Sequence, residues 1–215
     1  MHVITIKPTR SSNTVIITFS DRSVLPFSVD EFVKMGIKKY SDLDSRLLNQ
    51  IYQKSIEHQL WEYSLRQLSM ISQPEKIIGQ KLKNYCRKIF LLGNIKNDSI
   101  DTQLIITKIL SRLRDRGLIN NSVYAAGFVR KSYNKSRRRI IMELNQKGVS
   151  PSDQNLAVSA LNDKDKILNF FKKKKYTREN FLDWKEKNKI IAAFYRRGFS
   201  LSDIKSVIDD LIKNG

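Results

Sequence analysis

The same pattern occurs twice in the sequence, with a spacing of fifty residues. Residues 142–161 read MELNQKGVSPSDQNLAVSAL, and residues 192–211 read AAFYRRGFSLSDIKSVIDDL. Both copies contain a glycine, an apolar residue and then Ser-x-Ser-Asp, and apolar residues coincide again near the end of each copy. Glycine often ends a helix in the left-handed conformation, and a serine just after it can cap the next helix. Each copy therefore predicts a helix, a glycine turn and a second helix.

A repeated unit of this kind cannot bury its apolar face alone, so the pattern indicates stacked helical modules. Chance similarity between two ordinary helical corners is the alternative. The rest of the chain favours modules, because apolar residues recur at helical spacing from about residue 45 onward. Helices are predicted at 45–71, 75–92, 102–116, 122–133, 136–147, 152–161, 163–175, 178–197 and 202–213. Grouped in threes, they give three tandem three-helix modules.

The N-terminal segment differs from the rest because it contains short runs of β-branched residues. HVITIK, TVIITFS and SVLPFS are separated by PTRSSN and DR, which are typical of turns. We predict a small three-stranded antiparallel sheet in this segment. The predicted fold is therefore mainly α, with a β-rich extension at 1–44 and helical modules at 45–117, 118–162 and 163–215. A longer loop, LLGNIKNDSID, interrupts the first module.

The composition bounds the class of protein. A chain of 215 residues holds one or two domains and can bury a sizeable core without covalent staples. The single cysteine, Cys86, excludes an intrachain disulfide and a Cys-rich zinc site, and it fits a reducing cytoplasm. The sequence has no secretory start and no apolar run long enough for a bilayer. We therefore expect a cytoplasmic protein without membrane association.

Positive charge is concentrated in the C-terminal part of the chain. The formal net charge is +19, yet residues 1–70 carry nine Lys/Arg and seven Asp/Glu, whereas residues 71–215 carry 31 and 14. A polyanionic partner or an acidic protein surface is expected for the basic part, and a basic surface kept for solubility is the alternative. Because the predicted sheet lies in the nearly neutral part, we expect it to be separable from the basic helices.

The sequence shows no catalytic or metal-binding arrangement. His2 and His58 stand alone, with no Cys or carboxylate at ligand spacing. GNIKND lacks the Lys-Ser/Thr that a phosphate-binding loop needs. Carboxylates such as Asp183 and Glu186 lie in charged helical stretches. We therefore expect no enzyme activity, no cofactor and no bound metal.

A row of basic residues is predicted on the helix at 178–197. At about 100° per residue, its apolar side comprises Phe181, Trp184, Ile191, Phe194 and Tyr195. The basic row comprises Arg178, Lys185, Lys189 and Arg196, and Arg197 follows it directly. The row is roughly 27 Å long at 1.5 Å rise per residue. It suits a phosphate backbone or an acidic protein groove, and a solvated lysine-rich face is the alternative.

A second basic cluster lies in VRKSYNKSRRRIIMELNQKG, at 129–148. Glu143 is four residues from both Arg139 and Lys147, so these three side chains can simply support the helix. The candidates without a compensating acid are Arg130, Lys131, Arg137 and Arg138, where one helix ends and the next begins. The KKKK run at 172–175 closes a helix, where the helix dipole favours cations in any protein, and is the weaker candidate.

Three motifs of the basic part resemble those of the RecX family of bacterial recombination regulators. They read DRGLINNSVYAAGFVRKS, RRIIMELNQKGVS and KNKIIAAFYRRGFSLSDIKSVID, and Arg-Arg-Gly-Phe-Ser at 196–200 is the most specific piece. VLPFSVDEFVKMGIKKYSDLDSRLLNQI is similar to the N-terminal extension of some longer RecX proteins. One departure is Asn120 and Asn121, where the family usually has an acidic pair. Asparagine caps a helix as well as aspartate does, so the departure leaves the expected fold unchanged.

The resemblance implies three tandem three-helix modules that bind the RecA recombinase in the groove of its filament on single-stranded DNA. It further implies restraint of recombination and ATPase activity and a place in DNA repair and the SOS response. We also expect a monomer. The alternative is a DNA-binding protein that acts without RecA, either independently of sequence or as a helix-turn-helix reader of duplex. RNA association is a third alternative. The spread of basic residues over several modules favours the RecA regulator, because a duplex reader concentrates base contacts on one recognition helix.

Overall fold

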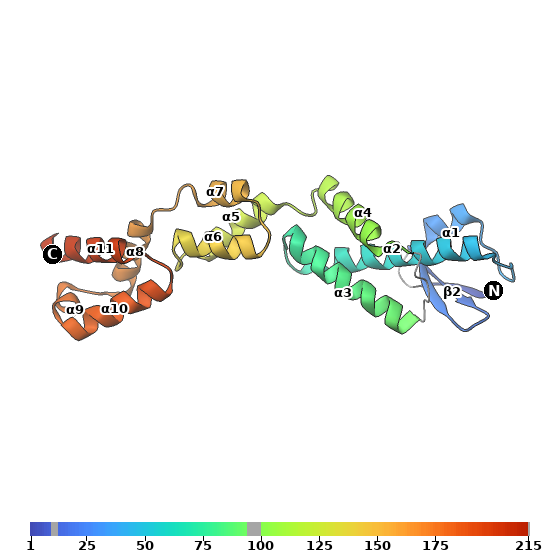
Figure 1. Ribbon diagram of the computed structural model, residues 1–215, viewed down its shortest axis with the longest axis horizontal. Coiled ribbons are helices and arrows are strands. Elements are labelled where there is room, and N and C mark those ends of the chain that lie inside the picture. The colour runs from blue at the N-terminus through green and yellow to red at the C-terminus, as the bar shows by residue number, and fades with distance from the viewer. Residues whose placement is uncertain (10–12, 94–99, 215) are drawn as a thin grey trace. The chain divides into compact units, whose positions relative to one another are not determined.

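The fold was analysed in a computed structural model, which describes residues 1–9, 13–93 and 100–214. The chain divides into two compact units, residues 1–119 and 120–215 (Figure 1). Strands occur at the N-terminus, and the remaining regular elements of the described residues are helices. The predicted fold class, mainly helical with a small N-terminal antiparallel sheet, is confirmed.

The N-terminal sheet has three antiparallel strands in sequence order. β1 (Val3–Pro8) pairs with β2 (Thr14–Phe19), which pairs with β3 (Val24–Ser28). Side chains alternate across a strand, and the odd-numbered residues 15, 17 and 19 of β2 are the buried ones. A short helix that the sequence analysis did not predict, α1 (Val29–Met35), follows the sheet and ends at Gly36, where φ is 62°.

Three helices complete the first unit: α2 (Ser45–Met70), α3 (Glu75–Gly93) and α4 (Thr102–Asp115). Asp44 and Asp101 cap α2 and α4, since their carboxylates accept from backbone N–H groups at 2.7 and 2.9 Å. These caps satisfy donors that lack a partner in the first turn of a helix. Residues 94–99 of the predicted long loop lie outside the described residues.

The sheet packs directly on α2. The Ser55 hydroxyl donates to the carbonyl of Pro26 at 2.7 Å, and His58 Nε2 shares a hydrogen bond with Thr14 Oγ1 at 2.9 Å. One buried apolar cluster runs from the strands through α2 into α3 and α4. The boundary predicted at residue 44 stays a prediction, as do those near 117 and 162, but the sheet and α2 share this core.

The second unit begins with a module of three helices: α5 (Asn121–Lys131), α6 (Arg137–Gln146) and α7 (Pro151–Val158). α7 packs against both α5 and α6. Asn120, which replaces the acidic residue of the family pattern, caps α5 by accepting from the N–H of Val123 at 3.0 Å. The buried apolar residues of this module are all aliphatic.

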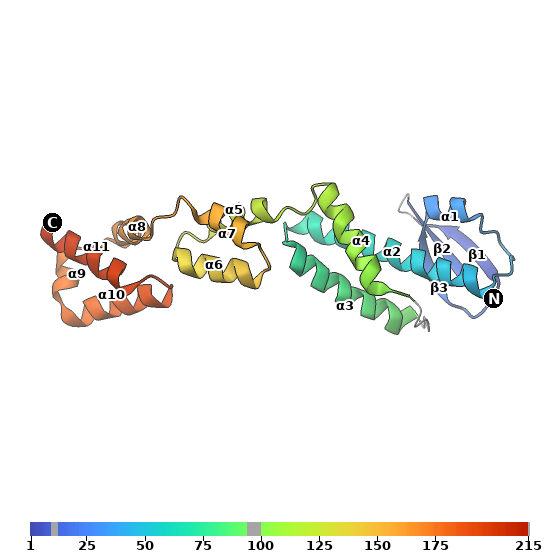
Figure 2. The ribbon, with the colours of Figure 1, turned by 45° about the horizontal axis from the view of Figure 1, so that its top comes forward.

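The next module contains α8 (Asp163–Lys174), α9 (Arg178–Leu182), α10 (Trp184–Arg196) and α11 (Leu201–Asn214), as Figure 2 shows. Its core contains four phenylalanines, which meet in edge and tilted ring contacts. The short α9 has no counterpart in the preceding module. It accounts for the longer connection between the first helix of this module and α10.

The sequence repeat is reproduced in individual hydrogen bonds. The glycine of each copy has a positive φ, 77° upstream and 90° downstream. Ser150 Oγ accepts from the N–H of Asp153 at 3.1 Å, and Ser200 Oγ accepts from the N–H of Asp203 at 3.0 Å. Each hydroxyl also donates to the same aspartate's carboxylate, at 2.8 and 2.6 Å. Buried positions match as well: Ile140 with Ile190, Leu144 with Phe194, Val149 with Phe199 and Val158 with Ile208.

Candidate partner and nucleic-acid interface

The single helix predicted at 178–197 is wrong, because α9 and α10 are separate helices that meet at Asp183. This residue has extended backbone angles (φ −74°, ψ 115°), and its carboxylate accepts from the backbone N–H of Lys185 at 2.8 Å. Aspartate favours this position because its oxygen satisfies an amide that the helix leaves unpaired. Arg178 is exposed on α9 and therefore does not continue the row formed on α10.

The buried side of α10 differs from the predicted apolar side. Ile190 and Phe194 face the core, whereas Trp184 and Tyr195 are 74% and 61% exposed. The predicted apolar side is therefore wrong for these two aromatic residues. The prediction left out Ile190, which with Phe194 sets the buried side; Trp184 and Tyr195 lie about 80–140° around the helix from these two residues.

The outer side of α10 carries basic and aromatic side chains together, and we call Trp184, Lys185, Lys189, Tyr195 and Arg196 the α10 face. The three basic residues are exposed, and none forms an ion pair with any residue in the described ranges. At about 100° per residue, they fall within about 40° of one another, and the two aromatic residues fall within about 20°. The structure thus keeps three of the four predicted row residues on one helical face.

Arg197 lies against the core of its module, next to the exposed row. Its guanidinium carbon is 4.3 Å from the ring centre of Phe170 and 5.4 Å from that of Phe194. The side chain is half-buried, and its Nη1 atom is buried without a hydrogen-bond partner among the described residues. A planar guanidinium suits such stacking. The structure therefore gives Arg197 packing contacts, and the exposed row ends at Arg196.

The second predicted cluster lies at the end of α5 and the start of α6. Arg130, Lys131, Arg137 and Arg138 are all exposed. Within the described part of the chain, none of them forms an ion pair. These four charges are therefore not offset by ion pairs among the described residues, and their contact with a partner stays a prediction.

Glu143 is paired beside this cluster. Its carboxylate lies 2.9 Å from Arg139 Nε, as predicted, but its second ion pair is with Lys135 at 2.6 Å and not with Lys147. Burial raises the pKa of the Glu143 carboxyl, but hydrogen bonds and charge from Lys135 and Arg139 outweigh this and lower the pKa below its usual value. Arg139 and Lys135 therefore share one carboxylate, which offsets one of their two positive charges.

The lysine run at 172–175 contacts the loop that carries this cluster. Lys173 Nζ lies 5.3 Å from the ring centre of Tyr133, in the loop between α5 and α6, and that tyrosine is 61% exposed. The end of α8 therefore lies beside the second cluster. The sequence analysis explained the lysine run by its favourable position at the end of a helix dipole. It did not predict this contact with Tyr133.

The two modules of the second unit meet at the start of α6, through polar contacts. Asp163, the first residue of α8, accepts from the backbone N–H of Arg137 with both carboxylate oxygens, at 2.9 and 3.2 Å. Lys166 donates from Nζ to the carbonyl of Lys135 at 3.0 Å. Burial lowers the pKa of the Lys166 amine, and the charge of Asp163 partly opposes this. All three hydrogen bonds cross from one module to the other.

A glycine allows the third contact between these modules. The Ser136 N–H donates to the carbonyl of Arg197 at 3.3 Å, directly before Gly198. A Cβ atom on Gly198 would lie 2.7 Å from Ser136 Oγ and 3.0 Å from the Cβ of Arg139. We call these contacts of Ser136, Asp163, Lys166 and Gly198 the inter-module joint. Gly198 is required both for its left-handed backbone and for this close approach.

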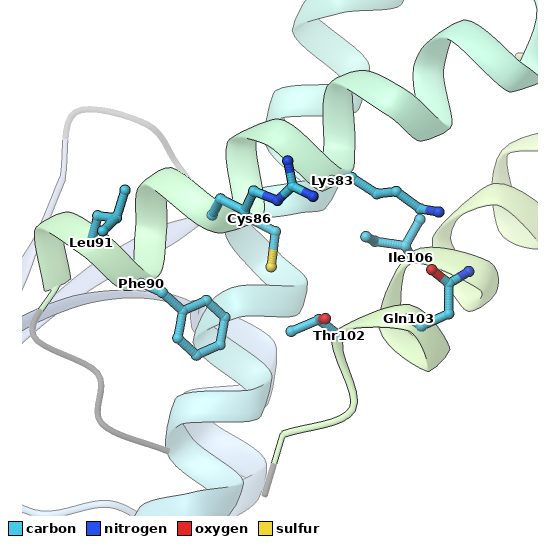
Figure 3. A pocket seen from close by; sticks show the side chains of 8 residues that line it. Lys83, Cys86, Phe90, Leu91, Thr102, Gln103 and Ile106 are labelled. Atoms are coloured by element: carbon cyan, nitrogen blue, oxygen red, sulfur yellow. The ribbon is translucent and has the colours of Figure 1, made fainter. Parts of the chain in front are cut away.

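Outside these surfaces, a hollow of about 660 Å³ lies between α3 and α4 (Figure 3). Cys86, Phe90 and Thr102 are among its lining residues. Burial raises the pKa of the Cys86 thiol, which therefore does not resemble a reactive thiolate. No group of three or more His, Cys, Asp or Glu side chains that could hold a metal occurs among the described residues. Their helices also include none with the length and apolar character needed to cross a bilayer.

Sequence reasoning missed the exposed aromatic residues of the α10 face and the inter-module joint. A signal for the first was present, because Asp183 is a favoured N-cap and Ile190 and Phe194 are already four residues apart. A helix whose buried side is set by Ile190 and Phe194 places Trp184 and Tyr195 about 80–140° away from that side. The joint had no comparable signal, since Asp163 and Ser136 look like ordinary helix caps in the sequence.

These features define a class of protein: tandem helical modules that present exposed basic surfaces on consecutive modules. The protein family that matches is RecX, whose third three-helix domain corresponds to residues 163–208. The crystal structure of a regulatory protein RecX has the same fold, with a TM-score of 0.67 and 20% identity, and the match covers 97% of this chain and 98% of that one.

A second solved structure supports the same fold. RecX from Lactobacillus salivarius aligns with a TM-score of 0.55 and 21% identity, over 73% of this chain and 96% of its own. No curated protein sequence matches the chain. The resemblance to the RecX family that the motifs indicated is confirmed by the domain match and by the shared fold.

Proposed function

We propose that this protein binds the filament of a RecA recombinase on single-stranded DNA and inhibits its recombination and ATPase activity. The observation that carries the proposal is a RecX fold with two exposed basic clusters on consecutive modules, the α10 face and the group around Arg137. A filament is an extended ligand, so a surface spread over consecutive modules can follow it. We further propose that the protein acts as a cytoplasmic monomer without a cofactor or catalytic activity.

The charge of the second unit supports an acidic or phosphate-bearing partner. Residues 120–215 carry 21 Lys/Arg and 10 Asp/Glu. Opposite charge on the partner steers association and is weakened by added salt. We therefore expect affinity for the filament to fall as the salt concentration rises.

A sequence-specific reader of duplex DNA is disfavoured by the helices that follow the two glycine turns. In a helix-turn-helix protein, the second helix enters the major groove and carries the base contacts. α7 contains no lysine or arginine, and α11 exposes Asp209 and Asp210. Acidic side chains on that helix would be repelled by phosphates. α11 also carries Lys205 and Lys213, but its three aspartates outnumber them, and the two basic clusters lie outside α7 and α11.

Charge reversal on α10 tests the proposal. Lys185→Glu with Lys189→Glu should weaken inhibition of the recombinase's DNA-dependent ATPase by about tenfold or more, because attraction becomes repulsion. The matched control is Lys83→Glu with Arg87→Glu, an exposed pair at the same spacing on α3. The free energy of unfolding of both variants should stay within about 0.5 kcal/mol of that of the unmodified protein. The lysine run at 172–175 is unsuitable as a control, because Lys173 contacts Tyr133.

The outcomes separate the two function classes. Loss of inhibition in the α10 variant alone supports a filament contact there. Equal inhibition by both variants and the unmodified protein contradicts the proposed surface. Tight, sequence-dependent binding to duplex DNA without the recombinase would favour the helix-turn-helix alternative.

A further inference from the structure

The α10 face exposes two aromatic side chains, and a contact made by charge alone does not explain their exposure. Trp184 and Tyr195 are 74% and 61% exposed, although large aromatic side chains are usually well buried. They lie about three turns apart on the same side of α10, by helical geometry. An exposed aromatic residue beside unpaired cations is a recurrent feature of nucleic-acid-binding surfaces.

The side chains between the aromatic and basic residues leave the rings uncovered. Asn188 and Ala192 occupy the strip between them, and both are exposed. The carboxylate of Asp183 accepts from the N–H of Lys185 and is already engaged in capping the helix. Glu186 lies about 60° or more from the basic residues around the helix. The face therefore has aromatic side chains along one edge and basic side chains along the other, with the smaller side chains of Asn188 and Ala192 between them.

We propose that the α10 face binds single-stranded DNA directly, with bases stacked on Trp184 and Tyr195 and phosphates held by Lys185, Lys189 and Arg196. Every base offers a flat face for stacking, so this contact needs no particular sequence. A duplex keeps these faces stacked on one another, so unpaired bases are the ligand that fits. An acidic protein surface would satisfy the cations but would leave the rings without a planar partner. The inference rests on the proposed function for the use of this face and adds a contact that does not need the recombinase.

Tryptophan fluorescence reports on this contact with little background. The sequence has two tryptophans, and Trp61 is 9% exposed with the Arg112 guanidinium 4.0 Å from its ring centre. Quenching by added DNA therefore reports mainly on Trp184. A short oligothymidylate titrated into the full-length protein, without recombinase, should quench the emission to saturation. Oligouridylate in parallel compares DNA with RNA, and a wholly abasic strand of equal length supplies phosphates without bases.

Stacking predicts a specific ranking of strands and variants. The abasic strand should bind more weakly and should quench little. Trp184→Ala with Tyr195→Ala should lower affinity for oligothymidylate by about tenfold or more, since stacking contributes about 1–3 kcal/mol per base. The matched control is Tyr40→Ala, which removes another exposed aromatic residue with a lysine, Lys39, 4.6 Å from its ring centre. Affinity is read independently from the anisotropy of a labelled strand.

Three results would overturn the inference. These are unchanged affinity in the double variant, equal quenching by the abasic strand, and quenching of Trp184 by recombinase alone but not by DNA. The ATPase assay keeps the proposed function separate. A double variant that loses strand binding but still inhibits the recombinase supports the inference and shows that inhibition uses other residues. An unmodified protein that inhibits the recombinase but does not bind oligothymidylate overturns the inference and leaves the proposed function standing.

Discussion

The first unit holds its parts together with one apolar core, whereas the second unit joins two small cores through polar contacts. In the first unit, buried residues run without interruption from the sheet through α2 into α3 and α4. In the second unit, each module has its own buried cluster, and hydrogen bonds at the inter-module joint connect them.

The difference determines how each unit responds to change. A shared apolar core couples every element that contributes to it, because the hydrophobic free energy is roughly proportional to the apolar area removed from water. Loss of one element exposes the apolar surface of the others. A joint of a few hydrogen bonds and one glycine fixes geometry with little buried area. Single substitutions can therefore alter the relation between the modules and leave each core intact.

Removal of residues 1–71 should produce the largest effect. α2 contributes Ile51, Ile56 and Leu60, all fully buried, to the shared core. Truncation of each such side chain typically costs about 2–5 kcal/mol, and a domain is stabilised by only about 5–15 kcal/mol. We therefore expect α3 and α4 to unfold in this truncated chain, and hydrogen exchange would show loss of protection there.

Two further truncations sharpen this result. A chain from residue 45 keeps α2 and tests whether the sheet is separable, as its neutral charge predicted. A chain from residue 120 should retain its helicity by circular dichroism, because its modules have their own cores. Protected α3 and α4 in the chain from residue 72 would show that the first unit is less coupled than its core indicates.

The two repeat glycines should differ in their tolerance of a side chain. Gly198→Ala and Gly148→Ala both place alanine at a positive φ, which costs about 1–2 kcal/mol. Gly198→Ala also forces a Cβ to within 2.7 Å of Ser136 Oγ, and overpacking of this kind costs about 1–3 kcal/mol more. Urea unfolding of both variants should therefore give the larger loss at Gly198.

A second substitution locates the cause of that difference. Ser136→Ala alone should cost about 1 kcal/mol, because it removes the cap of α6. In the Gly198→Ala background it should cost less, since it also removes the clashing oxygen. Strict additivity of the two substitutions would show that the joint does not bring these residues together in solution.

Asp163→Asn should have a moderate effect, because it weakens the charged acceptor of the Arg137 amide. A hydrogen bond to a charged group contributes about 1.5–3 kcal/mol to stability. Because this one is partly exposed, its loss should cost about 1 kcal/mol. Asp165→Asn is the matched control, since Asp165 lies in the same first turn of α8. It makes the same change of charge near the helix dipole. Hydrogen exchange at the Arg137 amide should accelerate only in the Asp163 variant, and equal acceleration would contradict the joint.

The fold was largely predictable because local signals carry it. Alternation of β-branched residues identified the strands, and the repeated glycine and serine identified the turns that follow α6 and α10. Local chemistry predicted a serine cap in each copy but left two candidates, Ser150 or Ser152 and Ser200 or Ser202, and the structure uses Ser150 and Ser200. The missed helix α1 is short and lies in a segment without clear periodicity.

The candidate site was less predictable because it depends on phase and on distant contacts. One capping aspartate, Asp183, divides the predicted helix, and packing of Ile190 and Phe194 in the core leaves Trp184 exposed. The stacking of Arg197 on Phe170 and the contact of Lys173 with Tyr133 join residues far apart in the sequence. Basic residues that look equivalent in the sequence therefore differ in the structure. Some pack on aromatic rings, some form ion pairs, and some are exposed without an ion pair among the described residues.

Glu143→Gln should produce the smallest effect, and its pH dependence identifies it. The folded-state pKa of this carboxyl is lowered, so its pairs with Lys135 and Arg139 stabilise the protein above the unfolded pKa. This contribution is lost as the pH falls through the folded pKa. At neutral pH the variant should be less stable by about 0.5–1 kcal/mol, since the pairs are partly exposed. In urea unfolding, the difference in free energy of unfolding between the variant and the unmodified protein should disappear below the ordinary titration range of a glutamate.

Glu186→Gln is the control for Glu143→Gln, because Glu186 is exposed and has no ion pair among the described residues. This variant should differ less from the unmodified protein. A difference for Glu143→Gln that stays constant with pH would mean that the carboxylate acts by packing and not by charge.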